Sequence, residues 1–392
     1  MGDGFREVTT RSWGQRLAGA FGGAIVGIVM VPLAVGLLWW NEGRSVDRLE
    51  ALATGRGQVV TVPAAPIDPA HDGRLVHISG LATTGQELAD TVFPVRRTAI
   101  RLTRDVRMYQ WQESKESRTE KELGGSERTE TVYRYAKAWS ADHIDSSAFR
   151  RGEGHENPGG MPLHSDAWQA DRVTVGAFRL AEGYVDRIGN EAELKLTPEM
   201  LAALPADMQG RYRIQSNSFV TGDLASPQVG DLQVRFAWVA PTDVSAIGRQ
   251  TGDRLTAFAT PTGELEILDL GYRDPETMFK AAEDENTVIT WIVRVAGIFL
   301  IGLGIFLLLS PLARLGDVVP VIGSLLGAGA ALVAVIVALP LGFTVIALAW
   351  LAFRPLLGLA MLALAGLAIG GGILLLRRRR RGRSPAGLSG SA

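Results

Sequence analysis

The feature that most limits how this chain can fold is a pair of long apolar regions, one near each end. Leu17 to Trp40 contains no charged residue, and as a helix it would be roughly 36 Å long, enough to cross a hydrocarbon layer of about 30 Å. The region from Val288 to Leu376 is also apolar over most of its length. Stretches this long predict membrane-spanning helices.

A cleaved signal peptide is the alternative interpretation of the first region. The apolar core of a signal peptide is shorter and ends in small residues, whereas this stretch ends in Leu37-Leu38-Trp39-Trp40. We therefore interpret residues 17–40 as the first span.

Four charged residues divide the second apolar region: Arg294, Arg314, Asp317 and Arg354. The division predicts span two at residues 291–312, a third membrane segment at 318–353 and span four at 355–376. Pro355 suits the first helical turn, where its missing N–H costs nothing. The expected fold class is thus a membrane protein with four α-helical transmembrane spans and one mostly-β (α+β) extramembrane domain.

The third segment is too long for one simple crossing, since 36 helical residues measure about 54 Å. Pro340, near its middle, predicts a break. Either the half after Pro340 lies along or re-enters the outer leaflet, or the segment holds two short crossings. We favour the first, because a fifth crossing would export the basic C-terminal tail.

Basic residues set the expected orientation, because they are enriched in cytoplasmic segments. Arg6, Arg11 and Arg16 precede span one, so residues 1–16 are expected to be a cytoplasmic tail. Residues 377–392 form a second basic tail, which is also expected to bind anionic lipid headgroups. Its arginines are Arg377, Arg378, Arg379, Arg380, Arg381 and Arg383.

With both termini cytoplasmic, residues 41–290 form an extracytoplasmic domain. This part of the chain has an acidic excess, in contrast to the basic ends. Tryptophans then fall at the outer interface, where an indole prefers to lie. They belong to a set of expected interface residues: Trp39, Trp40, Asn41, Glu42, Gly43, Arg44, Trp291, Trp350, Arg354 and Pro355.

Alternating apolar and polar residues predict strands in the domain. The expected strands are 100–111, 131–139 and 231–239, with a hairpin of 254–260 and 264–270; residues 112–130 are expected to be an exposed hairpin tip or strand extension. Pro198 and Pro275 each follow a capping residue, which predicts helices from 198 to 204 and from 277 to 285.

Small residues recur at four-residue spacing in three of the predicted spans, a pattern that lets helix backbones approach closely. The candidate packing positions are Gly19, Gly23, Gly27, Gly323, Gly327, Gly366 and Gly370. Glycine is common in membrane helices, so a specific packing face is only one of two interpretations.

Little in the sequence resembles an active site. The chain has no cysteine, and His155, His164 and Asp166 are the most suggestive polar group, although solvated loop residues explain them better than a metal site does. No cofactor is expected. The predicted spans lack Asp, Glu and His, which argues against a transporter. Arg354 either reaches the headgroups or has a gating role, and the first is favoured.

Several separated stretches together resemble the LUMA family, also called transmembrane protein 43. The first is Trp39-Trp40-Asn41-Glu42-Gly43-Arg44, which is similar to the family's Trp-Asn-Glu-Gly-Arg signature. The others are residues 106–111, 155–158 with 161–162, 230–231 and 350–356. They occur in order over nearly the whole chain.

The resemblance implies four spans, a large lumenal domain, self-association and no enzymatic activity. Eukaryotic members resemble proteins of the endoplasmic reticulum and inner nuclear membrane, with partners such as emerin and lamins. The abundance of Ala, Gly and Arg and the short tails favour a bacterial member in the cytoplasmic membrane, to which those partners would not carry over.

The leading hypothesis is therefore a non-enzymatic membrane scaffold, or an envelope-organising and stress-sensing protein, that associates with copies of itself and with lipid. Nucleic acid is not an expected partner. A ligand-binding or hydrolytic module built on His155, His164 and Asp166 is the alternative, and a transporter is the third hypothesis.

Overall fold

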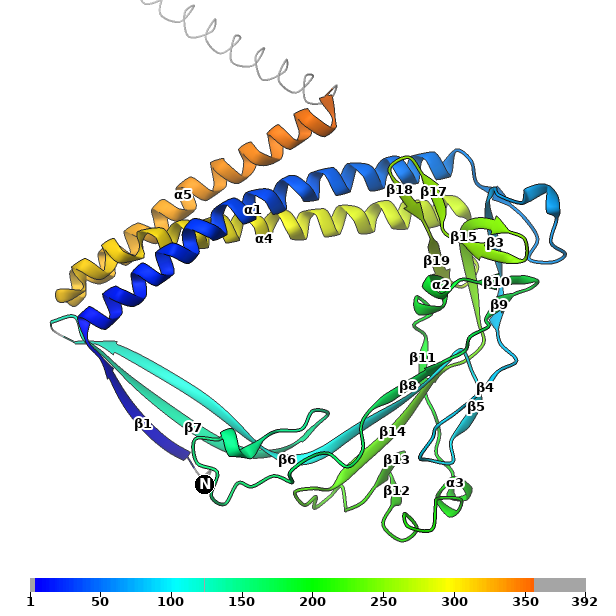
Figure 1. Cartoon of the computed structure of the whole chain (residues 1–392), viewed down its shortest axis with the longest axis horizontal. Helices are drawn as coiled ribbons and strands as arrows, with labels where there is room; N and C mark the ends of the chain where they lie inside the picture. Colours follow the sequence, from blue (N-terminus) through cyan, green and yellow to red (C-terminus); the bar gives the residue numbers. More distant parts are fainter. Residues whose placement is uncertain (1–3, 123, 356–392) are drawn as a thin grey trace, which may run out of the picture. The chain divides into compact units, whose positions relative to one another are not determined.

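The computed structural model describes residues 4–122 and 124–355, which divide into two compact units (Figure 1). The first unit contains the chain up to Gln15 together with Leu49–Glu285, and the second contains Arg16–Arg48 and the chain from Asn286. Compared with the domain expected at residues 41–290, the first unit is narrower at both borders, where it runs from Leu49 to Glu285, and it also includes the N-terminal residues.

Strands dominate the first unit, as the alternating pattern predicts. Its largest sheet has the order β1-β7-β6-β14-β13-β12, with β11 on β14 and β8 on β6. These strands are β1 (Gly4–Arg11), β6 (Arg101–Lys121), β7 (Glu127–Ser140), β8 (Asp166–Gln169), β11 (Glu191–Glu193), β12 (Arg213–Gln215), β13 (Ser218–Val220) and β14 (Leu232–Val239).

A second sheet of seven strands has the order β19-β15-β16-β10-β9-β3-β2, with β15 also paired to β3. Its strands are β2 (Val60–Thr61), β3 (Leu75–Thr83), β9 (Thr174–Val175), β10 (Phe178–Leu180), β15 (Thr242–Thr251), β16 (Arg254–Thr256) and β19 (Ile267–Leu270). Two small hairpins complete the strands: β4 (Glu87–Ala89) with β5 (Arg96–Thr98), and β17 (Phe258–Thr260) with β18 (Gly263–Leu265).

Only the middle of the expected 254–270 hairpin forms as such. β17 pairs with β18, whereas β19 pairs with residues 244–247 of β15 and β16 pairs with residues 249–251 of the same strand. Short helical elements lie between the strands: η1 (Pro69–His71), η2 (Ser146–Ala148), α2 (Glu182–Asp186) and α3 (Pro198–Ala202).

One face of β6 contributes to the core of the domain, because side chains of a strand alternate between its two faces. Its alternate side chains from Leu102 to Met108 are buried, and they pack with β14 residues such as Val234 and Phe236. Phe93 and Phe219 stack there with ring centroids 5.1 Å apart. The sequence pattern alone therefore identified the strand that organises this core.

Beyond the core, β6 and β7 continue as a long ribbon to which the N-terminal strand β1 adds a third strand (Figure 1). All eight residues of β1 pair with β7, from Gly4 opposite Arg134 to Arg11 opposite Glu127. An ion pair of 2.6 Å joins Arg6 to Glu130, and Glu7 pairs with Arg150.

This pairing contradicts the expectation that residues 1–16 are a tail on the opposite side of the membrane from the domain. Strands that share hydrogen bonds share one side of a bilayer, so the pairing and a single crossing by residues 17–40 exclude one another. The basic residues before the first apolar stretch misled the orientation argument because Arg6 is the partner of a domain carboxylate.

Within the described residues, three helices are long and apolar enough to cross a membrane. They are α1 (Trp13–Arg56), α4 (Pro275–Leu315) and α5 (Pro320–Phe353), and the short η3 (Gly316–Val318) joins α4 to α5. They contain the expected spans 17–40, 291–312 and 318–353. The fourth expected span lies outside the described residues except for Pro355, so the total of four spans is not established.

The predicted break at Pro340 is wrong. Helix α5 continues through Pro340, and its later half packs on α4, where a methyl group at Gly342 would lie 2.6 Å from Ile298. The Thr344 hydroxyl donates to the Pro340 carbonyl. Packing of the flanking turns thus offsets the single backbone hydrogen bond that proline removes.

The ends of α1 and α4 nearest the domain belong to its core rather than to the apolar layer. Leu52 of α1 and Phe279 of α4 are fully buried with Leu75, Ile247 and Leu265 of the sheets. Each helix is unbroken from this cluster into the second unit. The domain is therefore covalently anchored by two continuous helices.

The pairing of β1 with β7 predicts that Thr9→Cys and Thr129→Cys form a disulfide within one chain. The two residues are direct partners, and antiparallel partners lie about 4.5–5.5 Å apart, within disulfide range. Because the chain has no other cysteine, loss of reactivity toward a maleimide-linked polymer after mild oxidation reports the bond directly.

Thr10→Cys with Thr129→Cys is the matched control, since neighbouring residues of a strand point to opposite faces. If both thiols of the Thr9 and Thr129 variant stayed reactive after oxidation in intact membranes, β1 would not be part of the domain sheet.

Candidate functional site: a buried charge cluster among the long helices

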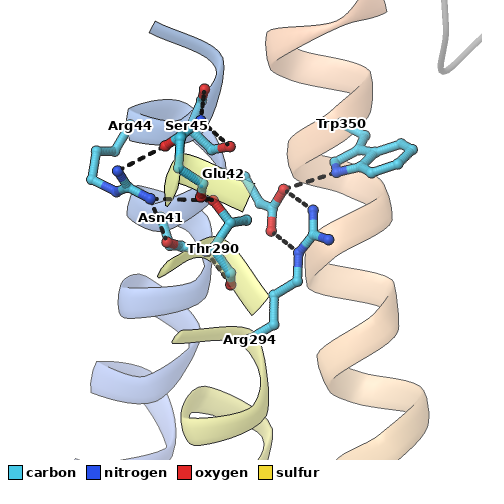
Figure 2. Close-up of polar contacts among 8 residues, drawn as sticks. Asn41, Glu42, Arg44, Ser45, Thr290, Arg294 and Trp350 are labelled. Atoms are coloured by element: carbon cyan, nitrogen blue, oxygen red, sulfur yellow. Dashed lines mark hydrogen bonds and ion pairs between the residues drawn. The ribbon is translucent and has the colours of Figure 1, made fainter. Parts of the chain in front are cut away.

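The polar residues of the second unit gather where α1, α4 and α5 meet (Figure 2). Glu42 lies at the centre, with only 2% of its surface exposed. Its two carboxylate oxygens accept hydrogen bonds of 2.7 Å from Nε and Nη2 of Arg294. The indole N–H of Trp350 donates a third, of 2.8 Å, so one carboxylate joins all three helices.

Two aromatic rings complete the surroundings of Arg294. Its guanidinium lies 4.8 Å from the ring centroid of Trp291 and 5.6 Å from that of Trp350. The face of an aromatic ring attracts a cation, so the two rings stabilise the guanidinium charge where water is scarce. The arrangement holds a buried Glu–Arg pair with both charges hydrogen-bonded, the condition under which such a pair is tolerated.

A second polar layer joins α1 to α4 next to this ion pair. Arg44 donates to the Asn286 side chain at 3.0 Å and to the Thr290 hydroxyl at 3.2 Å. Asn41 donates to the Thr290 carbonyl, and Asn286 donates to the Ser45 carbonyl. Asn41, Arg44 and Ser45 share one face of α1, and positions 286, 290 and 294 share one face of α4.

The remaining motif residues bring the end of α5 onto α1. Trp39 contacts Phe353 with ring centroids 5.6 Å apart, and a methyl group at Gly43 would lie 2.9 Å from the same ring. Only glycine admits this approach. Trp40 is 58% exposed, and the backbone N–H of Arg354 caps α5 by donating to the Trp350 carbonyl.

Most of the expected interface residues are thus interhelical contacts. The sequence placed Glu42 at an interface but gave no sign that it pairs with Arg294, because 252 residues separate them. Two partners were missed altogether, Asn286 and Thr290. They lie eight and four residues ahead of Arg294, and this helical spacing is the signal that could have identified them.

A second buried ion pair lies at the other end of the same helices. Arg16 of α1 pairs with Asp317, which is 1% exposed, and Arg314 approaches the same carboxylate at 3.2 Å. Asp317 belongs to η3, the turn between α4 and α5. The two clusters therefore fix both ends of the α1–α4–α5 packing.

Between the clusters, small residues allow close helix packing. A methyl group at Gly27 would lie 2.5 Å from the Gly304 carbonyl oxygen, and Gly23 faces Leu307 at an ordinary distance. Gly19 and Gly327 face open space, and Gly323 packs against Asp317 rather than against a helix. Gly366, Gly370 and the arginine run from Arg377 to Arg383 lie outside the described residues.

The expected polar group of the domain divides into one buried side chain and two exposed ones. His155 is buried, with its ring stacked on Tyr135 at 4.0 Å between centroids, while His164 and Asp166 are exposed. Arg104 contacts the backbone carbonyl of His164. No group of three His, Asp or Glu side chains that could hold a metal ion occurs in the described part of the chain.

His77, on β3, is a buried titratable group of the second sheet, with 4% of its surface exposed. Its Nε2 donates to the Arg273 carbonyl at 2.9 Å, which leaves Nδ1 to accept from the Thr61 hydroxyl. Burial lowers the pKa of His77 from its usual 6.5, although the Arg273 carbonyl and Asp274 oppose the shift. The neutral ring thus holds the chain segment that leads into α4.

These features define a class: an integral membrane protein whose long helices are joined by buried ion pairs and carry an inserted β-rich domain. Sequence comparison then gives the family. The pattern of the Transmembrane protein 43 family matches residues 108–355. Human Transmembrane protein 43 is 33% identical over 363 residues, which cover 90% of this chain and 89% of the relative.

The relatives extend to other animals. Transmembrane protein 43 of rat is 33% identical over 354 residues, with 87% of each chain covered, and the Drosophila homolog is 28% identical over 361 residues, 88% and 92% of the two chains. The chain belongs to the Transmembrane protein 43 family. No solved structure matches it.

Glu42→Gln is expected to lower the unfolding free energy in lipid nanodiscs by about 3–5 kcal/mol, because it leaves Arg294 buried without a countercharge. Arg294→Gln should cost a similar amount for the converse reason. The double variant should cost clearly less than the sum of the two. Thermal unfolding of the four proteins measures the coupling, and strictly additive losses would show that the pair does not interact.

We expect His77 to make the stability of the domain depend on pH. Because its folded-state pKa is lowered, the stability that the neutral ring contributes is complete above pH 6.5 and is lost as the pH falls through the folded-state pKa. His77→Gln should reduce the loss of thermal stability between neutral and mildly acidic pH. An unchanged pH dependence in this variant would assign the effect to other groups.

Proposed function

We propose that this protein is a non-enzymatic membrane scaffold whose copies associate, and which transmits strain between the membrane and its β-rich domain. The observation that carries the proposal is the pair of buried ion-pair clusters at Glu42 and Asp317. Clusters at both ends of three helices favour a fixed framework. A fixed helix framework that carries a large domain suits the organisation of a membrane or the sensing of stress in it.

The uncharged parts of the three helices support this choice over a transporter. Residues 17–40, 295–313 and 321–349 contain no ionisable side chain, so they offer no group to exchange protons or bind an ion. Four charged residues of the second unit instead form two buried pairs between elements, Glu42 with Arg294 and Arg16 with Asp317.

The continuity of α1 and α4 supports a role in force or signal transmission. Leu52 and Phe279 belong to the domain core, whereas Glu42 and Arg294 of the same two helices form the buried ion pair. A displacement of one helix along its axis therefore acts on both the ion pair and the core. The ligand-binding alternative loses support, since His155 is enclosed by aromatic rings.

The proposed membrane and partners are those of an integral membrane protein of this family. In a bacterium the protein would reside in the cytoplasmic membrane, and in a eukaryote in the endoplasmic reticulum or inner nuclear membrane. Its proposed partners are further copies of the chain, other membrane proteins and anionic lipids, the last through the arginines from Arg377 to Arg383.

Chemical crosslinking in native membranes tests self-association. Amine-reactive crosslinking at low expression should give dimers or larger species, and the purified protein in nanodiscs should show the same stoichiometry by mass photometry. Arg377 to Arg381 changed together to Gln is a useful variant, because it should weaken anionic-lipid binding and leave the oligomer intact. Monomers under all conditions would contradict the proposal.

A further inference from the structure

The ribbon formed by β1, β7 and β6 is the least enclosed part of the domain. From Ser114 to the end of β6, every residue is exposed, and every residue of β1 except Phe5 and Glu7 is exposed as well. The ribbon therefore has no well-buried apolar face in the part that extends past the core. Small sheets of this kind are marginally stable in water unless something packs on them or extends them.

Both outer edges of the ribbon are open. β1 pairs with β7 on one side only. At the other edge, β14 pairs with β6 no further than Met108. The Asn157 side chain then accepts a hydrogen bond from the Trp111 backbone N–H and donates one to the Trp111 carbonyl. Beyond that point, no strand in the described part of the chain pairs with the outer edge of residues 112–120. Unpaired strand edges are templates for another strand.

The two edges run in the same direction. β7 is antiparallel to both β1 and β6, so β1 and β6 are parallel to each other within one ribbon. If β1 of one copy lies beside β6 of the next, all copies keep the same direction along the sheet. A head-to-tail contact of this kind repeats, and it closes into a ring when the rotation per copy allows.

We propose that copies of this protein associate edge to edge, with β1 of one copy pairing in parallel with residues 112–120 of β6 in the next. This inference rests on the self-association in the proposed function and adds the surface that carries it. A strand from an unrelated protein would fill only one edge, whereas the same contact repeated from copy to copy fills both edges of each copy. The open edges also match in length, with eight residues in β1 and nine in β6.

One row of the ribbon carries opposite charges on its two edges. Arg6 and Glu116 are both partners of Val132, on its two sides, so they occupy one row of the ribbon. A sheet that continues at the same height brings Arg6 of one copy next to Glu116 of its neighbour. Arg11 and Lys121 share another row through Glu127, so the same register would also bring two like charges together at the end of the ribbon.

The test uses one cysteine in β1 and one in β6 of the full-length, otherwise cysteine-free chain. Thr9→Cys is combined in turn with Ser114→Cys, Ser117→Cys and Thr119→Cys, and membranes are oxidised before non-reducing electrophoresis. Within one copy β7 separates the two strands, which places them roughly 10 Å apart, too far for a disulfide. Any bond therefore joins two copies. Thr9→Cys with Thr129→Cys supplies the intramolecular control, which should remain monomeric.

A ladder of dimers, trimers and larger species from at least one pair supports the proposal, and the pair that reacts best gives the register. The single variants should show no ladder. Monomers from every pair, with amine crosslinking still yielding oligomers, would overturn the edge contact and leave self-association through another surface. Monomers by both methods would overturn the proposed function as well. Dimers from a single variant would indicate a symmetric contact and also overturn the proposal.

Discussion

The Glu42 carboxylate is the interaction on which the helix arrangement depends. A buried charge costs several kcal/mol unless it is paired and hydrogen-bonded, so its position is permitted only with Arg294 and Trp350 in place. One group therefore sets the register of α1, α4 and α5 together. The Asp317 cluster repeats this constraint at the opposite end of the helices.

The same two helices run without a break from the second unit into the domain. Apolar packing between α1 and α4 is spread over many contacts, whereas the ion pair is a single contact with strict geometry. Leu52 and Phe279 then carry the register of these helices into the cluster with Ile247 and Leu265. The backbone between Glu42 and Leu52 and between Phe279 and Arg294 is helical throughout.

Much of the fold could be predicted from the sequence, because each element is a local pattern. The uncharged stretch from Leu17 to Trp40 and the alternation from Leu102 to Met108 required no knowledge of distant residues. Pro340 was misjudged because tertiary packing outweighs the loss of one hydrogen bond. The N-terminal strand was missed because its eight residues look like a charged tail until β7 supplies the partner.

The site was harder to predict than the fold. The Trp-Asn-Glu-Gly-Arg stretch was recognised as an interface motif, but the partner of each side chain lies hundreds of residues away, so no spacing rule connects Glu42 to Arg294. A charge at the end of an apolar stretch has the same appearance whether it faces lipid headgroups or another helix. Only the three-dimensional arrangement distinguishes the two.

An experimental structure of the full-length protein in a lipid nanodisc, examined at Glu42, tests the central claim most directly. Side-chain density should connect Glu42 to Arg294 in a two-point contact, with the Trp350 indole on the same carboxylate. Arg294 turned toward lipid or solvent, with Glu42 facing no cation, would contradict the account.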